Sequence, residues 1–300
     1  MRLLALDAGT SGGKALVFDE EGHLLGAASE PWDYTSPPGL EMVGKEFDAD
    51  AFWAALARAA RAALEAAGAK SVDAVAATGM RQGNVFLAAD GRVLLAAPNL
   101  DARGLLYAME VESAVGADRL YALTGHYPPW IFAAARLEWL RREAPEGYAR
   151  LERVLTIADW VTWKLCGEAV AEPTGASETM LFDVARRAWS DEILDALNIS
   201  RAHLPDVRDG GVVAGKLTRA AAGALGLSAG TPVAVGGADT ELALLGAGLT
   251  DVGQVGIVLG STAPVQCVLS EPRMDPDQRL WTSCHAIPDR WVIESNALAA

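Results

Sequence analysis

The 300-residue sequence is poor in cysteine, basic residues and long apolar runs. Its three cysteines, Cys166, Cys267 and Cys284, are odd in number and have no CxxC spacing. The pattern therefore predicts neither a disulfide framework nor a zinc site. The chain has 25 Lys and Arg against 39 Asp and Glu, a formal net charge of −14. Because phosphate backbones and anionic membranes attract basic surfaces, this balance disfavours nucleic acid and membrane as partners.

The remaining composition is that of a folded protein with a large core. Apolar residues make up 51% of the chain and charged residues 21%, and 300 residues are enough for one large domain or two. The N-terminus enters a predicted strand directly, and no apolar run has membrane-spanning length, so we expect no signal peptide and a cytoplasmic location. A small anionic cofactor bound through Mg²⁺ stays compatible with the negative charge.

Strand-like and helix-like patterns alternate along the chain. An antiparallel meander is predicted at the start, and a helix capped by Asp48 runs to Gly68. The Asp90-Gly91 pair between apolar runs predicts a hairpin. The order of meander, helix, strand and helix favours an α/β fold with a mixed sheet flanked by helices. Further helices are expected at 105–115, 132–142 and 158–165 and after Ser190 and Thr218, and further strands at 72–79 and from Pro232.

The opening stretch, LLALDAGTSGGKALVFD at residues 3–19, places Asp7 between an apolar run and a cluster of small residues. Glycines allow close backbone approach, while hydroxyls and a lysine donate hydrogen bonds, so such a turn suits phosphate oxygens. Asp7 would then face a metal ion. The structural alternative is an ordinary glycine-rich hairpin. The residues of this candidate phosphate turn are Gly9, Thr10, Ser11, Gly12, Gly13 and Lys14.

A similar pattern returns near the end of the chain. Residues 252–269 again set an apolar strand, a Gly-Ser-Thr turn and another apolar strand. Two such turns could hold a phosphate chain from both sides. A chance repeat of a common hairpin is the alternative.

Asp239 follows a strand and the pair Gly236-Gly237, at the start of a predicted helix that ends near Gly246 or Gly248. A carboxylate at this position can serve structurally as a helix cap. The functional interpretation is a general base: the two glycines clear space for a substrate hydroxyl, and the carboxylate accepts its proton during attack on a γ-phosphate. This interpretation depends on Asp7 lying nearby.

Several ordered blocks together resemble the FGGY carbohydrate kinases. DAGTSGGKALVFD, WSDEILDALNI, GGADTELALLGAG and GSTAP occur in the order typical of that family, and residues 124–140 and 159–183 resemble its central blocks. The resemblance implies an actin-like ATPase fold of the ribonuclease H-like type, with ATP and Mg²⁺ as cofactors. It also implies an N-terminal sugar-binding domain at 1–248 and, at 249–300, the beginning of a C-terminal nucleotide-binding domain that the chain holds only in part.

The resemblance assigns roles to individual residues. Asp7 matches the family's metal-associated aspartate, and Asp239 matches its catalytic base. Lys14 stands where many members have arginine, so a point charge replaces a planar fork. The first phosphate turn corresponds to Gly9, Thr10 and Ser11, and the second to Gly260, Ser261 and Thr262, although Ser-Thr-Ala differs from the commoner Thr-Gly.

We expect two loops to determine which substrate is bound. Met80-Arg81-Gln82-Gly83 resembles the Met-Arg-Glu-Gly of autoinducer-2 kinases, and APNLDARG at residues 97–104 resembles another of their stretches. Gln82 replaces their glutamate, which keeps an acceptor and loses a charge. The alternatives are a local ion pair for Asp101 with Arg103 and a core role for Trp130. The expected substrate contacts are Arg81, Gln82, Asp101, Trp130, Asp239 and Thr240.

The sequence thus predicts ATP-dependent phosphorylation of a small sugar or polyol, with an autoinducer-2 (dihydroxypentanedione)-type substrate favoured. A xylulokinase-like or other pentulose or polyol kinase is the first alternative. Because no adenine pocket is recognisable in the 300 residues, a non-catalytic sugar-binding fragment is another. An actin-like ATPase that works on protein partners is a third, and a homodimer stays open.

Overall fold

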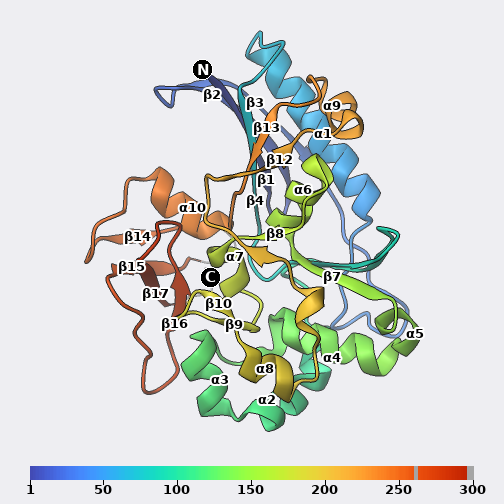
Figure 1. Cartoon of the computed structure of the whole chain (residues 1–300), viewed down its shortest axis with the longest axis vertical. Helices are drawn as coiled ribbons and strands as arrows, with labels where there is room; N and C mark the ends of the chain where they lie inside the picture. Colours follow the sequence, from blue (N-terminus) through green and yellow to red (C-terminus); the bar gives the residue numbers. More distant parts are fainter. Residues whose placement is uncertain (260–262, 296–300) are drawn as a thin grey trace.

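The computed structural model describes residues 1–259 and 263–295. A six-stranded mixed sheet forms its upper part, in the order β12-β13-β4-β1-β2-β3 (Figure 1). Strands β1, β2 and β3 form the predicted antiparallel meander, while β4 is parallel to β1 and β13 is parallel to β4. The strands are β1 (Arg2–Ala8), β2 (Gly12–Asp19), β3 (Leu24–Pro31), β4 (Ala74–Gly79), β12 (Val213–Lys216) and β13 (Pro232–Ala234).

This topology places three predicted loops at one edge of the sheet. Because β1, β4 and β13 are parallel neighbours, their carboxyl ends meet at the same edge, which is where open α/β sheets bind ligands. Asp7, Arg81 and Asp239 lie at or just after these three ends.

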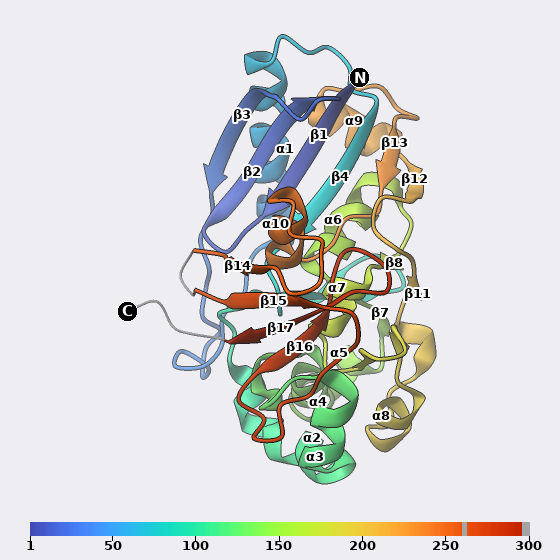
Figure 2. The same cartoon turned by 90° about the vertical axis from the view of Figure 1, so that its left-hand side faces the viewer.

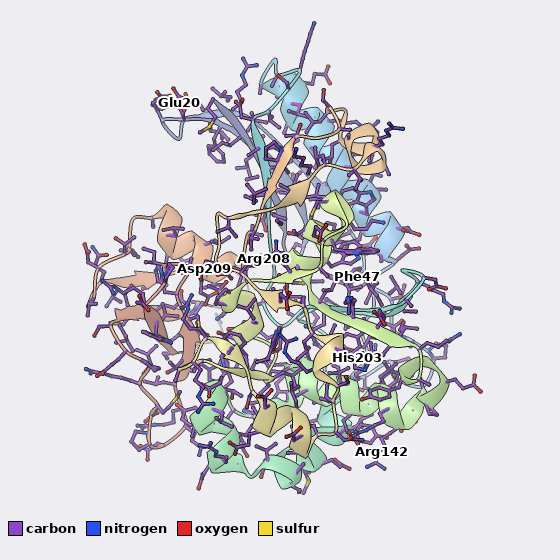
Figure 3. All side chains as sticks on the ribbon, in the orientation of Figure 1. Glu20, Phe47, Arg142, His203, Arg208 and Asp209 are labelled. Carbon is purple, nitrogen blue, oxygen red and sulfur yellow. The ribbon has the colours of Figure 1, made fainter. Side chains whose placement is uncertain are left out.

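Three helices cover one face of the sheet, α1 (Ala49–Ala66), α6 (Ile157–Cys166) and α9 (Arg219–Leu225) (Figure 1). As predicted, Asp48 caps α1, its side chain accepting from the backbone N–H groups of Asp50 and Ala51. Phe47, labelled in Figure 3, lies between two of these helices, with its ring 4.3 Å from that of Phe52 and 6.2 Å from that of Trp160. These rings belong to the first hydrophobic core, between sheet and helices.

The predicted hairpin at Asp90-Gly91 joins β5 and β6, and a strand that the sequence analysis did not predict, β7, pairs with the other edge of β5. Val85 faces the first core and Phe86 a second one, so β5 is buried on both sides. This part contains β5 (Asn84–Ala88), β6 (Val93–Ala97), β7 (Leu151–Thr156), α2 (Ala108–Val115), α3 (Ala117–Thr124), α4 (Ala133–Glu143), α5 (Pro145–Tyr148) and α8 (Asp191–Ala196), with 3-10 turns at Arg103–Tyr107, Pro129–Ile131 and Arg201–His203.

Short elements connect the two parts. Strand β8 pairs in parallel with β11, and β9 pairs antiparallel with β10. Helix α7 lies near α10, which begins at Asp239 (Figure 1). These elements are β8 (Val170–Ala171), α7 (Pro173–Ser177), β9 (Phe182–Asp183), β10 (Ala188–Trp189), β11 (Asp206–Val207) and α10 (Asp239–Gly246).

The last described strands form a separate antiparallel sheet, ordered β14-β15-β17-β16, beside the lower end of the first sheet (Figure 2). Cys284 and Trp291 of this sheet belong to the second core, and the Trp291 indole donates to the Val184 carbonyl at 2.7 Å. The strands that contain Cys284 and Trp291 are therefore packed against the preceding chain, and the domain boundary at residue 248 stays a prediction. Its strands are β14 (Val255–Ile257), β15 (Val265–Leu269), β16 (Trp281–Cys284) and β17 (Trp291–Ser295).

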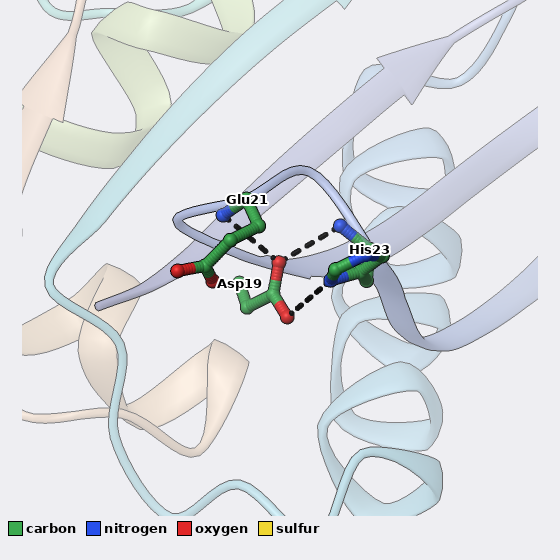
Figure 4. Close-up of side chains that lie close together, drawn as sticks. All are labelled: Asp19, Glu21 and His23. Carbon is green, nitrogen blue, oxygen red and sulfur yellow. Dashed lines mark hydrogen bonds and ion pairs between the residues drawn. The ribbon is translucent and has the colours of Figure 1, made fainter.

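The turn between β2 and β3 is held by Asp19 (Figure 4). One carboxylate oxygen accepts from the backbone N–H groups of Glu21 and His23, and the other lies 3.0 Å from Nδ1 of His23. These contacts give the exposed acidic turn a structural role. Across the described residues, no helix is both long and apolar enough to cross a membrane.

Candidate active site

A cavity of about 610 Å³ brings together the first phosphate turn and the start of α10. Asp7 and Asp239, which the sequence analysis placed in separate motifs, both line it. Their proximity is the condition on which the general-base interpretation depended. The lining residues are Asp7, Gly9, Thr10, Ser11, Gly12, Gly13, Lys14, Ser29, Glu30, Pro31, Asp239, Thr240, Ala243, Val258 and Leu259.

Two glycines of the first turn have a packing role in addition to the predicted one. A Cβ on Gly12 would lie 2.5 Å from the Glu30 carbonyl oxygen, and one on Gly13 would lie 2.7 Å from the Trp32 ring. Both glycines therefore let β2 pack closely against neighbouring chain. On Gly9 a Cβ would make only ordinary contacts, the nearest at 3.5 Å. Gly12 and Gly13 thus have a packing role and also line the cavity, and ligand approach at the three glycines stays a prediction.

The structure corrects the expectation for Gly236 and Gly237, the two glycines before Asp239. A Cβ on Gly236 would lie 1.7 Å from the Ala77 carbonyl oxygen of β4, and one on Gly237 would lie 2.5 Å from Oε2 of Glu172. The two glycines clear space for a strand and a buried glutamate, whereas we expected them to clear space for a substrate hydroxyl.

Asp7 has the features of a cation ligand. Its Oδ2 lies 3.6 Å from Nζ of Lys14, while its Oδ1 is buried and accepts no hydrogen bond from the residues that the structure describes. Burial raises the pKa of Asp7, and the Lys14 ammonium partly offsets that rise. An unsatisfied carboxylate oxygen beside a candidate phosphate turn fits a hard cation such as Mg²⁺, which is bound through one or two carboxylates together with phosphates.

Hydrogen bonds from three side chains fix the candidate phosphate turn at Thr10. The Thr10 carbonyl accepts from the Tyr34 hydroxyl and the Trp32 indole, and its hydroxyl accepts from Nδ2 of Asn99 at 2.9 Å. These contacts fix the turn, while the neighbouring Ser11 stays exposed toward solvent.

Asp239 is the first residue of α10, and Ala238 occupies the N-cap position. The carboxylate accepts from the Thr240 backbone N–H at 2.8 Å and from the Thr240 hydroxyl at 3.2 Å. Burial raises the pKa of Asp239 to about 6; Arg81 lowers it and Asp7 raises it further. A pKa near neutrality suits a general base, because the group is then ionised at working pH and still basic enough to accept a proton.

Arg81, a predicted substrate contact, is buried among three carboxylates (8% exposed). Its Nη1 lies 2.8 Å from Glu294, 3.4 Å from Glu241 and 3.6 Å from Glu178. The sequence analysis missed all three glutamates. The available signal was a single acidic residue within each of three otherwise uncharged stretches, TGASETML, TELALL and WVIES.

Gln82 adopts a left-handed backbone conformation, with φ of 56°. Its side-chain amide donates to Glu178, and its backbone carbonyl accepts from the Arg136 guanidinium. A glutamate at this position would set two carboxylates against each other. The amide in place of the charge therefore has a structural explanation in this chain.

Asp101 is fully buried and bound by basic groups. Its carboxylate accepts from Nε of Arg103 at 2.8 Å, from Nε of Arg136 at 3.0 Å and from the backbone of Lys45 at 2.9 Å. The local ion pair given as the alternative is therefore present. Trp130 is half-buried. Sugar contacts by Asp101 and Trp130, like those by Arg81, Gln82 and Thr240, stay predictions, and Gly260, Ser261 and Thr262 lie outside the described residues.

Comparison with known proteins decides the family. The model of the FGGY family of carbohydrate kinases, N-terminal domain, matches residues 2–246. The chain belongs to this family. An autoinducer-2 kinase of Enterobacter sp. (strain 638) is 34% identical over an alignment of 299 residues that covers 98% of this chain and 56% of that protein. The chain therefore spans little more than half the length of this FGGY relative.

Solved structures of FGGY kinases share the fold. A xylulose kinase from Rhodospirillum rubrum matches 99% of this chain and 60% of that one, with a TM-score of 0.90 and 25% identity. A glycerol kinase from Plasmodium falciparum, 18% identical, has a TM-score of 0.87 over 99% of this chain and 61% of that one, and this likeness shows the fold alone. The predicted actin-like ATPase fold is confirmed.

Proposed function

We propose that the protein transfers the γ-phosphoryl group of ATP to a hydroxyl of a small sugar or polyol. The observation that carries the proposal is the shared cavity of Asp7, the first phosphate turn and Asp239. Phosphoryl transfer needs positioned phosphates, charge neutralisation and a base near the nucleophile, and these residues offer all three.

In the proposed reaction, Asp239 accepts the proton of the acceptor hydroxyl. The acceptor oxygen forms a bond to the γ-phosphorus while the bond from phosphorus to the bridging oxygen of ADP breaks, and ADP leaves. The turn at Thr10 and Ser11 donates hydrogen bonds to phosphate oxygens, and Lys14 adds a positive charge beside it. Mg²⁺, which Asp7 would hold, supplies charge neutralisation on the phosphates.

For the acceptor, we infer an autoinducer-2 (dihydroxypentanedione)-type molecule. Support comes from the Met80-Arg81-Gln82-Gly83 loop and from 34% identity to an autoinducer-2 kinase. The second candidate is a pentulose such as xylulose, which the likeness to the Rhodospirillum rubrum xylulose kinase favours.

A substrate panel tests both the reaction and the acceptor. Full-length protein is incubated with ATP, Mg²⁺ and, separately, 4,5-dihydroxy-2,3-pentanedione, xylulose, ribulose, erythritol or glycerol. ADP release is measured by a coupled assay, and the product is identified by mass spectrometry. We expect the dihydroxy-dione to have the highest kcat/KM. A clear preference for xylulose would overturn the assignment of the acceptor, while the proposed kinase activity would stand.

Two other outcomes would overturn the proposal that the protein is a kinase. Heat release on adding sugar without nucleotide, with no phosphorylated product from any acceptor, would identify a sugar-binding fragment. ATP hydrolysis that no sugar stimulates would favour an actin-like ATPase acting on protein partners. Light scattering of the same sample tests the homodimer.

A further inference from the structure

We propose that two threonine hydroxyls, from Thr78 and Thr174, together with Glu172, position the general base by clamping the Gly237–Ala238 peptide directly before Asp239. This inference rests on the proposed function, because it assigns the clamp to the same carboxylate. The three positioning residues come from β4 and from the N-terminus of α7, far from Asp239 in the sequence.

Both polar atoms of this one peptide group are held by side chains. The Thr78 hydroxyl donates to the Gly237 carbonyl at 2.9 Å. The Ala238 N–H donates to Oγ1 of Thr174 at 2.8 Å. A peptide plane fixed at its carbonyl and at its N–H cannot rotate without breaking both bonds, and the next residue is Asp239.

Glu172 determines which way the Thr174 hydroxyl points. A threonine hydroxyl has one proton, and Thr174 donates it to Oε2 of Glu172. A lone pair of the same oxygen is then left to face the Ala238 N–H. Glu172 is itself fixed, because the same Oε2 accepts from the backbone of Thr174 at 2.7 Å and of Gly175 at 3.3 Å.

The local sequence allows this approach only because residue 237 is glycine. A Cβ there would lie 2.5 Å from Oε2 of Glu172 and 2.7 Å from Oγ1 of Thr174. On its other side, Ala238 forms a parallel bridge with Gly79 at the end of β4. The clamp thus joins β4, α7 and α10 at the point where the base begins its helix.

Catalysis is sensitive to such positioning. A misplacement of about 1 Å at a reacting group costs on the order of 10²-fold in rate. Loosening the peptide should therefore lower kcat while leaving the binding of ATP and acceptor nearly unchanged. A purely structural role would instead lower stability without a selective effect on kcat.

The first test compares matched threonine variants in the full-length protein. Thr174→Val and Thr78→Val remove one hydroxyl each at nearly constant volume. We expect kcat to fall about 10- to 100-fold with both KM values within about twofold of the parent. Thr174→Ser, which keeps the hydroxyl, should recover most of the loss. Thr162→Val is the control, because Thr162 is also buried and its hydroxyl bonds only within α6, to Ala158 at 3.0 Å.

A second readout needs no activity. In the protein labelled with ¹³C at aspartate carboxyls, the Asp239 signal is titrated by NMR. Thr174→Val should move its pKa from about 6 toward the ordinary aspartate value, because a released carboxylate gains solvent, and Thr162→Val should leave it unchanged. If the parent phosphorylates nothing, the proposed function fails while this titration still tests the clamp.

The proposal is overturned if folded Thr174→Val has a kcat within twofold of the parent, or leaves the Asp239 titration unchanged. Should Thr174→Val fail to fold, Thr78→Val carries the same test from the other end of the peptide.

Discussion

Two groups of charged residues lie side by side at the sheet edge, and their surroundings differ. Asp7 and Asp239 line a cavity, and one oxygen of Asp7 is unpartnered among the described residues. Arg81, from the loop after β4, is enclosed by Glu178, Glu241 and Glu294. The first group has capacity to bind a ligand, whereas the second is taken up by protein contacts.

The difference teaches that a predicted substrate contact can also act on the site through another residue. Arg81 lowers the pKa of Asp239, so it acts on the base while its guanidinium contacts glutamates. The cavity pair should therefore respond to substitution through activity, and the Arg81 cluster mainly through stability. The predictions that follow separate the two, from the largest expected effect to the smallest.

Asp239→Asn should lower kcat by about 10²–10⁴-fold and leave the fold and sugar binding intact, because an amide cannot accept the proton. Steady-state kinetics at saturating substrate in the full-length protein, with circular dichroism for the fold, measure this. Asp195→Asn, on the exposed side of α8, is the control and should keep the parent's rate. Turnover of Asp239→Asn within about tenfold of the parent would remove Asp239 as the base.

Arg81→Ala should lower the free energy of unfolding by about 3–5 kcal/mol, because buried carboxylates lose their partner. Arg58→Ala breaks the exposed pair with Glu30, at 2.9 Å, and should cost under about 1 kcal/mol. Urea unfolding of both variants compares buried with exposed charge. Equal losses would show that the Arg81 cluster is not more important for stability than a surface pair.

The Arg81→Ala loss should also depend on pH. Burial would raise the pKa of Glu178 once Arg81, which now lowers it, is gone. The destabilisation should then be largest above the raised pKa of Glu178 in the variant and shrink as the pH falls toward about 2, where the carboxylate of the parent is protonated as well.

The pH dependence of kcat/KM should report Asp239. With its pKa raised to about 6 by burial, the base is protonated and inactive at lower pH, so kcat/KM should fall about tenfold per pH unit below about pH 6. Substitution of Lys14 or of Asp195 should leave the pH at which kcat/KM begins to fall nearly unchanged. If kcat/KM instead began to fall only near pH 4, the Asp239 carboxylate would be solvated in the working enzyme.

The same shift predicts a stability effect with a definite sign. A raised folded-state pKa means that ionised Asp239 destabilises the fold above about pH 6, while below about pH 4 that cost is absent. Asp239→Asn should therefore be more stable than the parent at pH 8, by on the order of 1–2 kcal/mol, and similar to it at pH 4. Thermal unfolding at both pH values measures this, and no difference between them would contradict it.

The smallest effect is expected at Lys14. The Lys14 ammonium is exposed and lies 3.6 Å from Asp7, so Lys14→Met should raise the Asp7 pKa further and barely change stability. NMR titration of the Asp7 carboxyl measures the shift. A fall in that pKa would contradict the pairing.

Local patterns were enough to predict many of the elements. Asp48 capped its helix and Asp90-Gly91 formed a hairpin, because caps and tight turns depend on neighbouring residues alone. Strand β7 was missed, since its sequence, LERVLT, carries no clear alternation and its partner β5 lies more than sixty residues earlier. The predicted association of Asp7 with Asp239 required the family resemblance, because nothing local links the two motifs.

The sequence by itself determined the strand–turn–strand opening, the helix that starts at Asp239 and the candidate phosphate turn, because these follow from periodicity and short-range chemistry. Tertiary structure alone decided that Arg81 meets Glu294, 213 residues away, and that Gly237 and Ala238 are held by Thr78 and Thr174. The physical reason is that a buried polar group must find a partner wherever the packed chain brings one within hydrogen-bond distance, and sequence separation does not limit that choice.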